Sequence, residues 1–104
     1  MRVLVMFDLP TLMSNQRKSY RNFRKYLIKS GFLMMQESVY SKLALNQSSA
    51  SIVVKNIEKN KPSEGLVQVL IITEKQFSSM KTIVGDVKSD VIDSDERLLI
   101  LWWD

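Results

Sequence analysis

Apolar and polar residues alternate along this chain in blocks that predict strands and helices in turn. Residues 2–7 form a nearly continuous apolar run that ends at Asp8, and Pro10 prevents simple continuation. Runs of this kind are typical of a strand buried within a sheet. We therefore expect a central strand with Asp8 at its C-terminal tip.

The next block has helical periodicity. Ser14 is a suitable N-cap, and Tyr20, Phe23 and Leu27 recur at helical spacing before Gly31. The pattern predicts an amphipathic helix over residues 14–30. Further along we expect one bent strand or two short strands over 32–43, a helix over 48–59, a strand over 66–73, a short helix or turn over 74–84, a polar loop over 87–94 and a last strand over 97–103.

The order strand, helix, strand, strand, helix, strand predicts a ferredoxin-like α/β sandwich with an appended C-terminal strand. A chain of 104 residues accommodates one such domain, residues 1–104. The six elements already complete a four-stranded sheet, so the additional apolar strand needs another edge, and a partner chain offers one. We expect a strand-exchanged homodimer held by residues of this C-terminal region: Asp95, Glu96, Arg97, Leu98, Leu99, Ile100 and Leu101.

Composition narrows the chemistry that the chain can perform. The chain contains neither cysteine nor histidine, which excludes disulfides, thiol catalysis, thiolate zinc sites and the commonest general base. Catalysis would depend on carboxylates, hydroxyls, Lys or Arg, with a hard cation such as Mg²⁺. The N-terminal apolar run is too short for a signal peptide, and no run approaches the roughly 18 apolar residues of a membrane helix. We expect a cytoplasmic protein without a membrane partner.

Charge is distributed unevenly along the chain. No acidic residue lies between Asp8 and Glu37, whereas the C-terminal part is rich in acids. A basic face indicates a polyanionic partner such as duplex DNA, bound through phosphates without sequence preference. The alternative is that both runs are ordinary solvated faces. The candidate nucleic-acid-binding residues are Arg17, Lys18, Arg21, Arg24, Lys25 and Lys29, which we expect to form a solvent-facing stripe.

Asp8 is the candidate catalytic and metal-binding residue. The strand would fix the carboxylate while the following loop leaves it open to solvent. One carboxylate per chain makes a poor nuclease, but two Asp8 side chains meeting at a dimer axis could share one Mg²⁺ per dimer. The alternative is that Asp8 caps the turn that contains Pro10.

Several segments in order resemble a known family. They are residues 7–11 (FDLPT), 17–25 (RKSYRNFRK), 31–32 (GF), 36–42 (QESVYSK), 73–77 (TEKQF), 84–86 (VGD) and 94–97 (SDER). Together they resemble the second core CRISPR-associated protein, Cas two, in its type II-A form. The resemblance covers nearly the whole chain.

The resemblance implies a homodimer of ferredoxin-like protomers whose last strand crosses onto the partner. In the family, this dimer bridges two dimers of the CRISPR integrase, Cas one, and the assembly captures short duplex DNA as a new spacer. Members are often described as Mg²⁺-dependent endoribonucleases or DNases, with the aspartate that matches Asp8 as metal ligand. In some systems the role in spacer acquisition is structural and does not need nuclease activity.

We therefore expect a CRISPR-adaptation scaffold that grips duplex DNA through the helix of residues 14–30 and docks the integrase through its acidic C-terminal region. A second hypothesis is a metal-dependent endonuclease acting on RNA or DNA through paired Asp8. A third, an unrelated ferredoxin-like regulatory dimer, is disfavoured by the basic helix.

Overall fold

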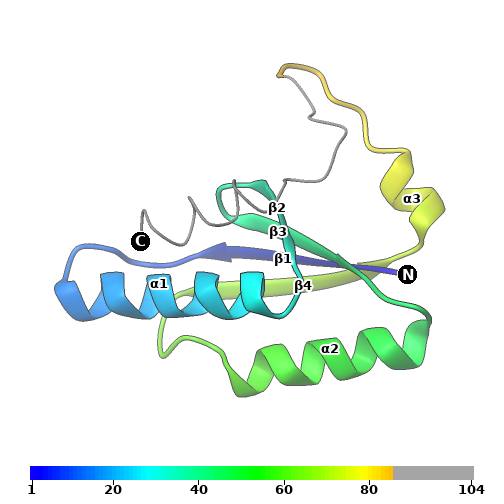
Figure 1. Ribbon diagram of the computed structural model, residues 1–104. Coiled ribbons are helices and arrows are strands. Elements are labelled where there is room, and N and C mark those ends of the chain that lie inside the picture. The colour runs from blue at the N-terminus through cyan, green and yellow to red at the C-terminus, as the bar shows by residue number, and fades with distance from the viewer. Residues whose placement is uncertain (86–104) are drawn as a thin grey trace.

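A computed structural model describes residues 1–85 of the chain and contains four strands and three helices. The elements are β1 (Arg2–Asp8), α1 (Ser14–Lys29), β2 (Leu33–Gln36), β3 (Val39–Leu43), α2 (Gln47–Lys59), β4 (Leu66–Ile72) and α3 (Glu74–Ser78). The strands form one antiparallel sheet in the order β2-β3-β1-β4 (Figure 1). This topology confirms the ferredoxin-like α/β prediction.

The helix boundaries differ slightly from those expected. Helix α1 begins at Ser14 with Met13 as the N-cap residue, so Ser14 is not the cap. The backbone N–H of Met13 donates to Gln16 Oε1 at 2.9 Å. Gln16, at the third helical position, thus supplies one of the two hydrogen bonds of a capping box, whereas the N-cap residue Met13 has no hydroxyl to supply the other. Helix α2 begins one residue earlier than expected because the Asn46 side chain accepts from Ser49 N at 2.8 Å.

The segment over residues 32–43 forms two strands rather than one bent strand. Strand β2 pairs with β3, and the register shifts between Met34 and Gln36. Tyr40, on β3, is fully buried. Lys42 anchors this hairpin to α1, because its Nζ donates to the carbonyl oxygen of Ser30, the C-cap residue of the helix.

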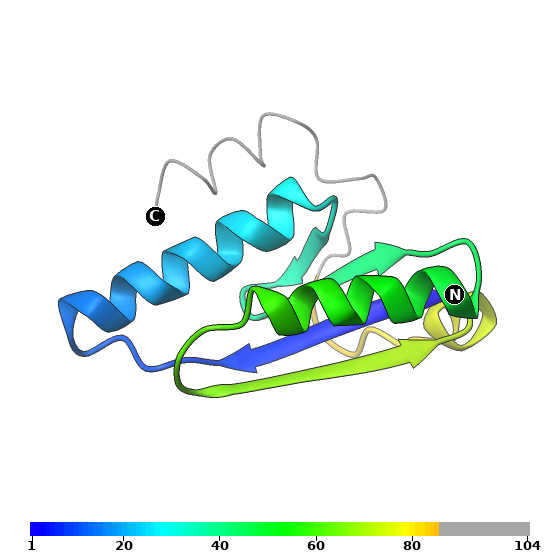
Figure 2. The same ribbon diagram turned by 90° about the horizontal axis from the view of Figure 1, so that it is seen from below.

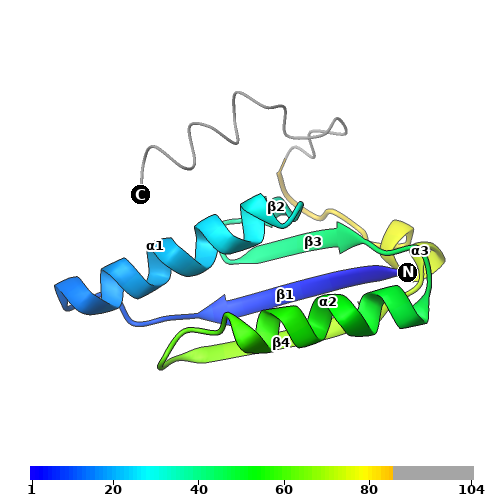
Figure 3. The same cartoon turned by 60° about the horizontal axis from the view of Figure 1, so that its bottom comes forward.

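The core lies between the sheet and the two long helices. Figures 2 and 3 show α1 and α2 side by side on one face of the sheet. Alternate residues of β1, namely Val3, Val5 and Phe7, turn toward the helices and are at most 5% exposed. Leu27 of α1 and Ile57 of α2 meet them in the same cluster. Burial of each such side chain contributes about 1.5–3 kcal/mol to folding.

The opposite face of the sheet is largely apolar and is not covered by α1 or α2. By strand alternation and register, this open face carries Leu4 and Met6 of β1, beside residues of β3 and β4. Leu43, Leu66 and Leu70 lie on it and are 59%, 54% and 50% exposed. We refer to the surface formed by these three leucines, Met6 and Ile72 as the open sheet face.

Helix α3 is attached to the start of β1 by one arginine. Arg2 donates from Nε and Nη2 to the two carboxylate oxygens of Glu74 at 2.8 and 2.9 Å. Its guanidinium also lies 4.3 Å from the centroid of the Phe77 ring. The hydrogen bonds from Arg2 hold the pKa of the exposed Glu74 carboxyl below its ordinary value.

Some of the expectations fall on residues beyond those described. The polar loop over 87–94, the last strand over 97–103, and its candidate dimer residues lie outside residues 1–85. Among the described residues, none of the helices combines the length and the hydropathy that crossing a bilayer requires.

Candidate metal and nucleic-acid site

Asp8 occupies the C-terminal tip of β1, as the sequence predicts. It pairs with Leu66 of β4 and its side chain is exposed, whereas the preceding Phe7 is 5% exposed. Because side chains alternate along a strand, the inward position of Phe7 places Asp8 on the face that carries Leu66. The carboxylate is therefore at the edge of the open sheet face.

The Asp8 carboxylate makes no hydrogen bond or ion pair with any residue of the described part of the chain. The alternative that it caps the following turn therefore has no support in this structure. Within residues 1–85 there is also no group of three His, Cys, Asp or Glu side chains that could hold a metal ion. Asp8 is thus a free carboxylate that would need ligands from elsewhere to complete a metal site.

The backbone around Asp8 is fixed by a close contact with the residue that precedes β4. Gly65 has φ +100°, a conformation that side chains other than glycine rarely adopt. A Cβ atom at this position would lie 2.6 Å from Leu9 Cδ2 and 3.0 Å from the Asp8 carbonyl oxygen. Glycine is needed here because the two backbones approach too closely for a side chain.

Side chains in the first turn of α1 secure two different connections: Arg17 bonds to the one between β1 and α1, and Gln16 bonds to the one between α2 and β4. Arg17 Nη1 donates to the carbonyl oxygens of Thr11 and Leu12 at 3.2 and 2.8 Å. Gln16 Nε2 donates to Glu64 Oε1 at 3.0 Å. The exposed Arg17 thus has a structural role in addition to its expected one, because it secures the loop that follows Asp8.

The remaining cations of α1 differ in exposure. Lys18 and Lys29 are exposed, whereas Arg21 and Lys25 are half-buried. No hydrogen bond or ion pair engages these four side chains in residues 1–85. They leave a basic surface on α1, which we call the α1 basic surface and define as Arg17, Lys18, Arg21, Lys25 and Lys29.

The expectation that Arg24 joins this solvent-facing stripe is wrong. Arg24 is 9% exposed, and its Nε donates to Tyr40 Oη at 3.1 Å. Its guanidinium lies 5.5 Å from the centroid of the Tyr20 ring. Arg24 follows Phe23 and precedes Leu27 by three residues, so it lies at the boundary of the buried helix face. The buried hydroxyl of Tyr40 gives the guanidinium of Arg24 a hydrogen-bond partner.

Sequence reasoning misses the structural roles of Gly65 and Arg24. In the sequence Gly65 resembles any isolated turn residue, and its place directly before a strong strand is the only available signal. The partner of Arg24 lies 16 residues away on another element, so no local pattern points to it. The candidate residues Asp95, Glu96, Arg97, Leu98, Leu99, Ile100 and Leu101 lie outside the described residues.

An antiparallel sheet with two helices on one face, a free carboxylate ending an internal strand, and a basic first helix together define a small ferredoxin-like protein. Residues 1–80 match the family described as CRISPR associated protein Cas2. The chain belongs to this family.

Three relatives illustrate the similarity, and each is named CRISPR-associated endoribonuclease Cas2. The protein of Treponema denticola is 56% identical over 101 residues, covering 97% of this chain and 100% of the relative. That of Ligilactobacillus salivarius is 48% identical, with 97% and 100% covered. That of Streptococcus mutans is 44% identical, with 97% and 93% covered.

We predict that Gly65→Ala destabilises the protein more than Gly85→Ala does. Both glycines have positive φ, +100° and +111°, but a Cβ at Gly85 would meet no atom of residues 1–85 within 4 Å. Gly85→Ala should therefore cost only the backbone strain of about 1 kcal/mol, and Gly65→Ala should add a steric cost for a total of about 2–4 kcal/mol. Chemical denaturation followed by circular dichroism measures both, and equal losses of stability would show that the contact with Leu9 is unimportant.

Proposed function

We propose that this protein is a dimeric scaffold of CRISPR adaptation that binds duplex DNA without sequence preference and bridges dimers of the integrase. The observation that carries the proposal is the α1 basic surface, whose five cations form no ion pair with an acidic residue within residues 1–85. Family membership supports a CRISPR-associated role.

Duplex DNA suits this surface because its phosphates form a regular row of negative charges. Cations along one helix contact phosphates without reading bases, which gives affinity but little sequence preference. Within the described residues, the sheet offers no exposed aromatic side chain for stacking unpaired bases, since Tyr40 of β3 is buried. The integrase would dock through the acidic C-terminal region that includes Asp95 and Glu96.

The open sheet face supports the proposed homodimer. Leu43, Leu66 and Leu70 are at least half exposed there. Large apolar patches on small domains mark protein–protein contacts. A second copy that covers this face, together with exchange of the last strand over 97–103, would bury these side chains. Because Asp8 lies at the edge of the same face, the two Asp8 carboxylates would approach the interface together.

A second candidate function is a Mg²⁺-dependent endonuclease, acting on RNA or DNA. It is favoured by the Asp8 carboxylate, which has no hydrogen-bond or ion-pair partner within residues 1–85, and by the names of the relatives. Mg²⁺ is commonly held by one or two carboxylates and keeps several waters, so paired Asp8 side chains fit one ion per dimer. When bound, the ion would polarise a phosphate oxygen. Asp8 itself would anchor it, and the α1 basic surface would hold the flanking phosphates.

The first test of this proposal concerns charge. We expect that replacing Arg21, Lys25 and Lys29 with Gln weakens duplex binding and flattens its salt dependence. Removal of one phosphate-binding cation reduces the slope of log affinity against log salt by about 0.9. Fluorescence anisotropy over a salt series provides the measurement. A control that replaces Lys55, Lys59 and Lys75 removes the same charge elsewhere, and equal effects of the two triple variants would contradict a specific role for α1.

The second test concerns the dimer. Leu70→Lys should shift the protein to monomer, because it places a charge in each half of the apolar interface. Ile52→Lys is the matched control, since Ile52 is 60% exposed on α2, away from the sheet. Sedimentation velocity distinguishes the outcomes. A tight dimer in Leu70→Lys would show that the open sheet face is not the contact.

The third test concerns catalysis. If the protein cleaves nucleic acid with Mg²⁺, Asp8→Asn should reduce the rate at least about a hundredfold, because an amide binds Mg²⁺ poorly. DNA binding and dimer formation should be unchanged, since the Asp8 carboxylate supports no other described residue. Glu37→Gln, at another exposed acid, is the control. Unchanged cleavage by purified Asp8→Asn would assign the activity to another site.

A further inference from the structure

Helix α3 stands at the end of the open sheet face that is remote from Asp8. Figure 1 shows α3 beside the start of β1, on the opposite side of the sheet from α1 and α2. The alternation that points Val3 into the core places Arg2 on the same side of the sheet as Asp8. Arg2 and Asp8 begin and end β1, whose 7 residues span about 20 Å. The open sheet face therefore has a carboxylate at one end and a helix at the other.

Contacts with Arg2, rather than burial, hold α3 in this position. None of the residues Glu74–Ser78 is buried. Arg2 donates two hydrogen bonds to the carboxylate of Glu74 and lies against the ring of Phe77. A single residue, Thr73, connects α3 to β4 and caps the helix. This short connection limits how far α3 can move, and Arg2 fixes where it stands against the sheet.

Apolar surface alone would not decide where along this face a second copy packs. Leu43 and Ile72 pair with Arg2 at one end, and Leu66 pairs with Asp8 at the other. Leu43 and Leu66 are similarly exposed, so both ends offer apolar area to a partner. A copy that slides along the strands by two residues presents the same alternation of side chains, which leaves the register weakly specified. A steric feature is needed to fix the register.

Helix α3 is thick enough to block one direction of sliding. A helix with its side chains is about 10–12 Å across, and two packed sheets lie about 10 Å apart. Because α3 projects on the open side of the sheet, it fills the layer that a second sheet would occupy. A second copy cannot move past Arg2 without displacing α3.

We propose that α3, held by Arg2, is a stop that confines a second copy of this chain to the half of the open sheet face nearer Asp8. In a symmetric pair, each copy meets the same surface of the other. If the two-fold axis crossed the strands in the half nearer Arg2, the Asp8 end of each copy would collide with α3 of the other. If the axis ran along the strands, the two α3 helices would meet at the same end.

The remaining arrangement has its axis across the strands in the half nearer Asp8, which brings the two Asp8 carboxylates toward each other. Arg2 is thus a positioning residue for Asp8, and it acts through α3 and the second copy rather than by contact. The inference rests on the proposed homodimer and adds what sets its register.

The experiment measures the separation of the two copies at position 8. The chain contains no cysteine, so Asp8→Cys provides a single site for a spin label, and double electron–electron resonance reports the distance between the two labels of a dimer. With α3 in place we expect one narrow distance distribution. Adding Arg2→Gln or Glu74→Gln should broaden it and add a population about 7 Å longer, because packing along a strand repeats every two residues.

Two controls separate the stop from a general effect on the fold. Glu58→Gln removes an exposed carboxylate from α2, away from the open sheet face, and should keep the narrow distribution. Exchange of the pair, Arg2→Glu with Glu74→Arg, restores an ion pair between β1 and α3 and should narrow the distribution again. Circular dichroism and sedimentation velocity on the same samples report folding and oligomeric state.

The outcomes separate this inference from the proposed function. Dimeric Arg2→Gln and Glu74→Gln proteins with an unchanged narrow distribution would overturn the role of α3 and leave the homodimer standing. Folded but monomeric variants would overturn it as well, because a stop excludes packing positions and adds no affinity. A monomeric wild type would contradict the homodimer of the proposed function, and the stop with it.

Discussion

The packing of Phe7 against three aromatic rings is the interaction on which the rest of this structure depends. Its ring centroid lies 5.2 Å from that of Phe23 and 6.0 Å from that of Tyr20, both on α1, and 5.6 Å from that of Tyr40 on β3. These contacts hold α1 onto the sheet in edge and stacked geometries that favour aromatic pairs. Because the Phe7 side chain points into the core, the Asp8 side chain must lie on the opposite face of the sheet. Because the Phe23 side chain also points into the core, the cations of α1 lie on the outer side of the helix.

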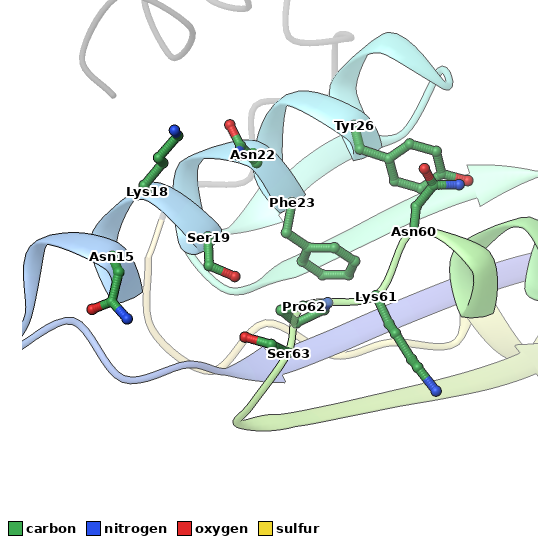
Figure 4. Close-up of a pocket in the computed structure, with 10 residues that line it drawn as sticks. All are labelled: Asn15, Lys18, Ser19, Asn22, Phe23, Tyr26, Asn60, Lys61, Pro62 and Ser63. Atoms are coloured by element: carbon green, nitrogen blue, oxygen red, sulfur yellow. The ribbon is translucent and has the colours of Figure 1, made fainter.

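The one-sided burial of the sheet gives the molecule two different surfaces. The helical side carries the α1 basic surface, and a groove lined in part by Lys18 and Lys61 lies beside it (Figure 4). The other side is the open sheet face, which is largely apolar and ends at Asp8. A dimer formed through this second side would leave the helical sides of both protomers free, so self-association and DNA binding would not compete for one surface.

Three arginines of this protein stabilise the fold as well as carrying charge. Arg24 is buried against Tyr40 and Tyr20, Arg17 secures the loop after β1, and Arg2 attaches α3 to the sheet. The planar guanidinium with its several N–H donors suits each of these sites better than an ammonium would. A count of cations along α1 therefore overstates the charge available to a polyanion.

The sequence by itself determined the order of elements, the central position of β1 and the placement of Asp8 at its tip, because hydrophobic periodicity and Pro10 act over a few neighbouring residues. It also revealed the basic character of α1 and carried the family resemblance. The burial of Arg24, the contact of Gly65 with Leu9, and the joining of Lys18 and Lys61 in one groove were decided only by the tertiary structure. Each of these three contacts joins residues that are far apart in the sequence. The position of α1 against the sheet and against the 60–63 connection results from packing of the whole core rather than from any local pattern.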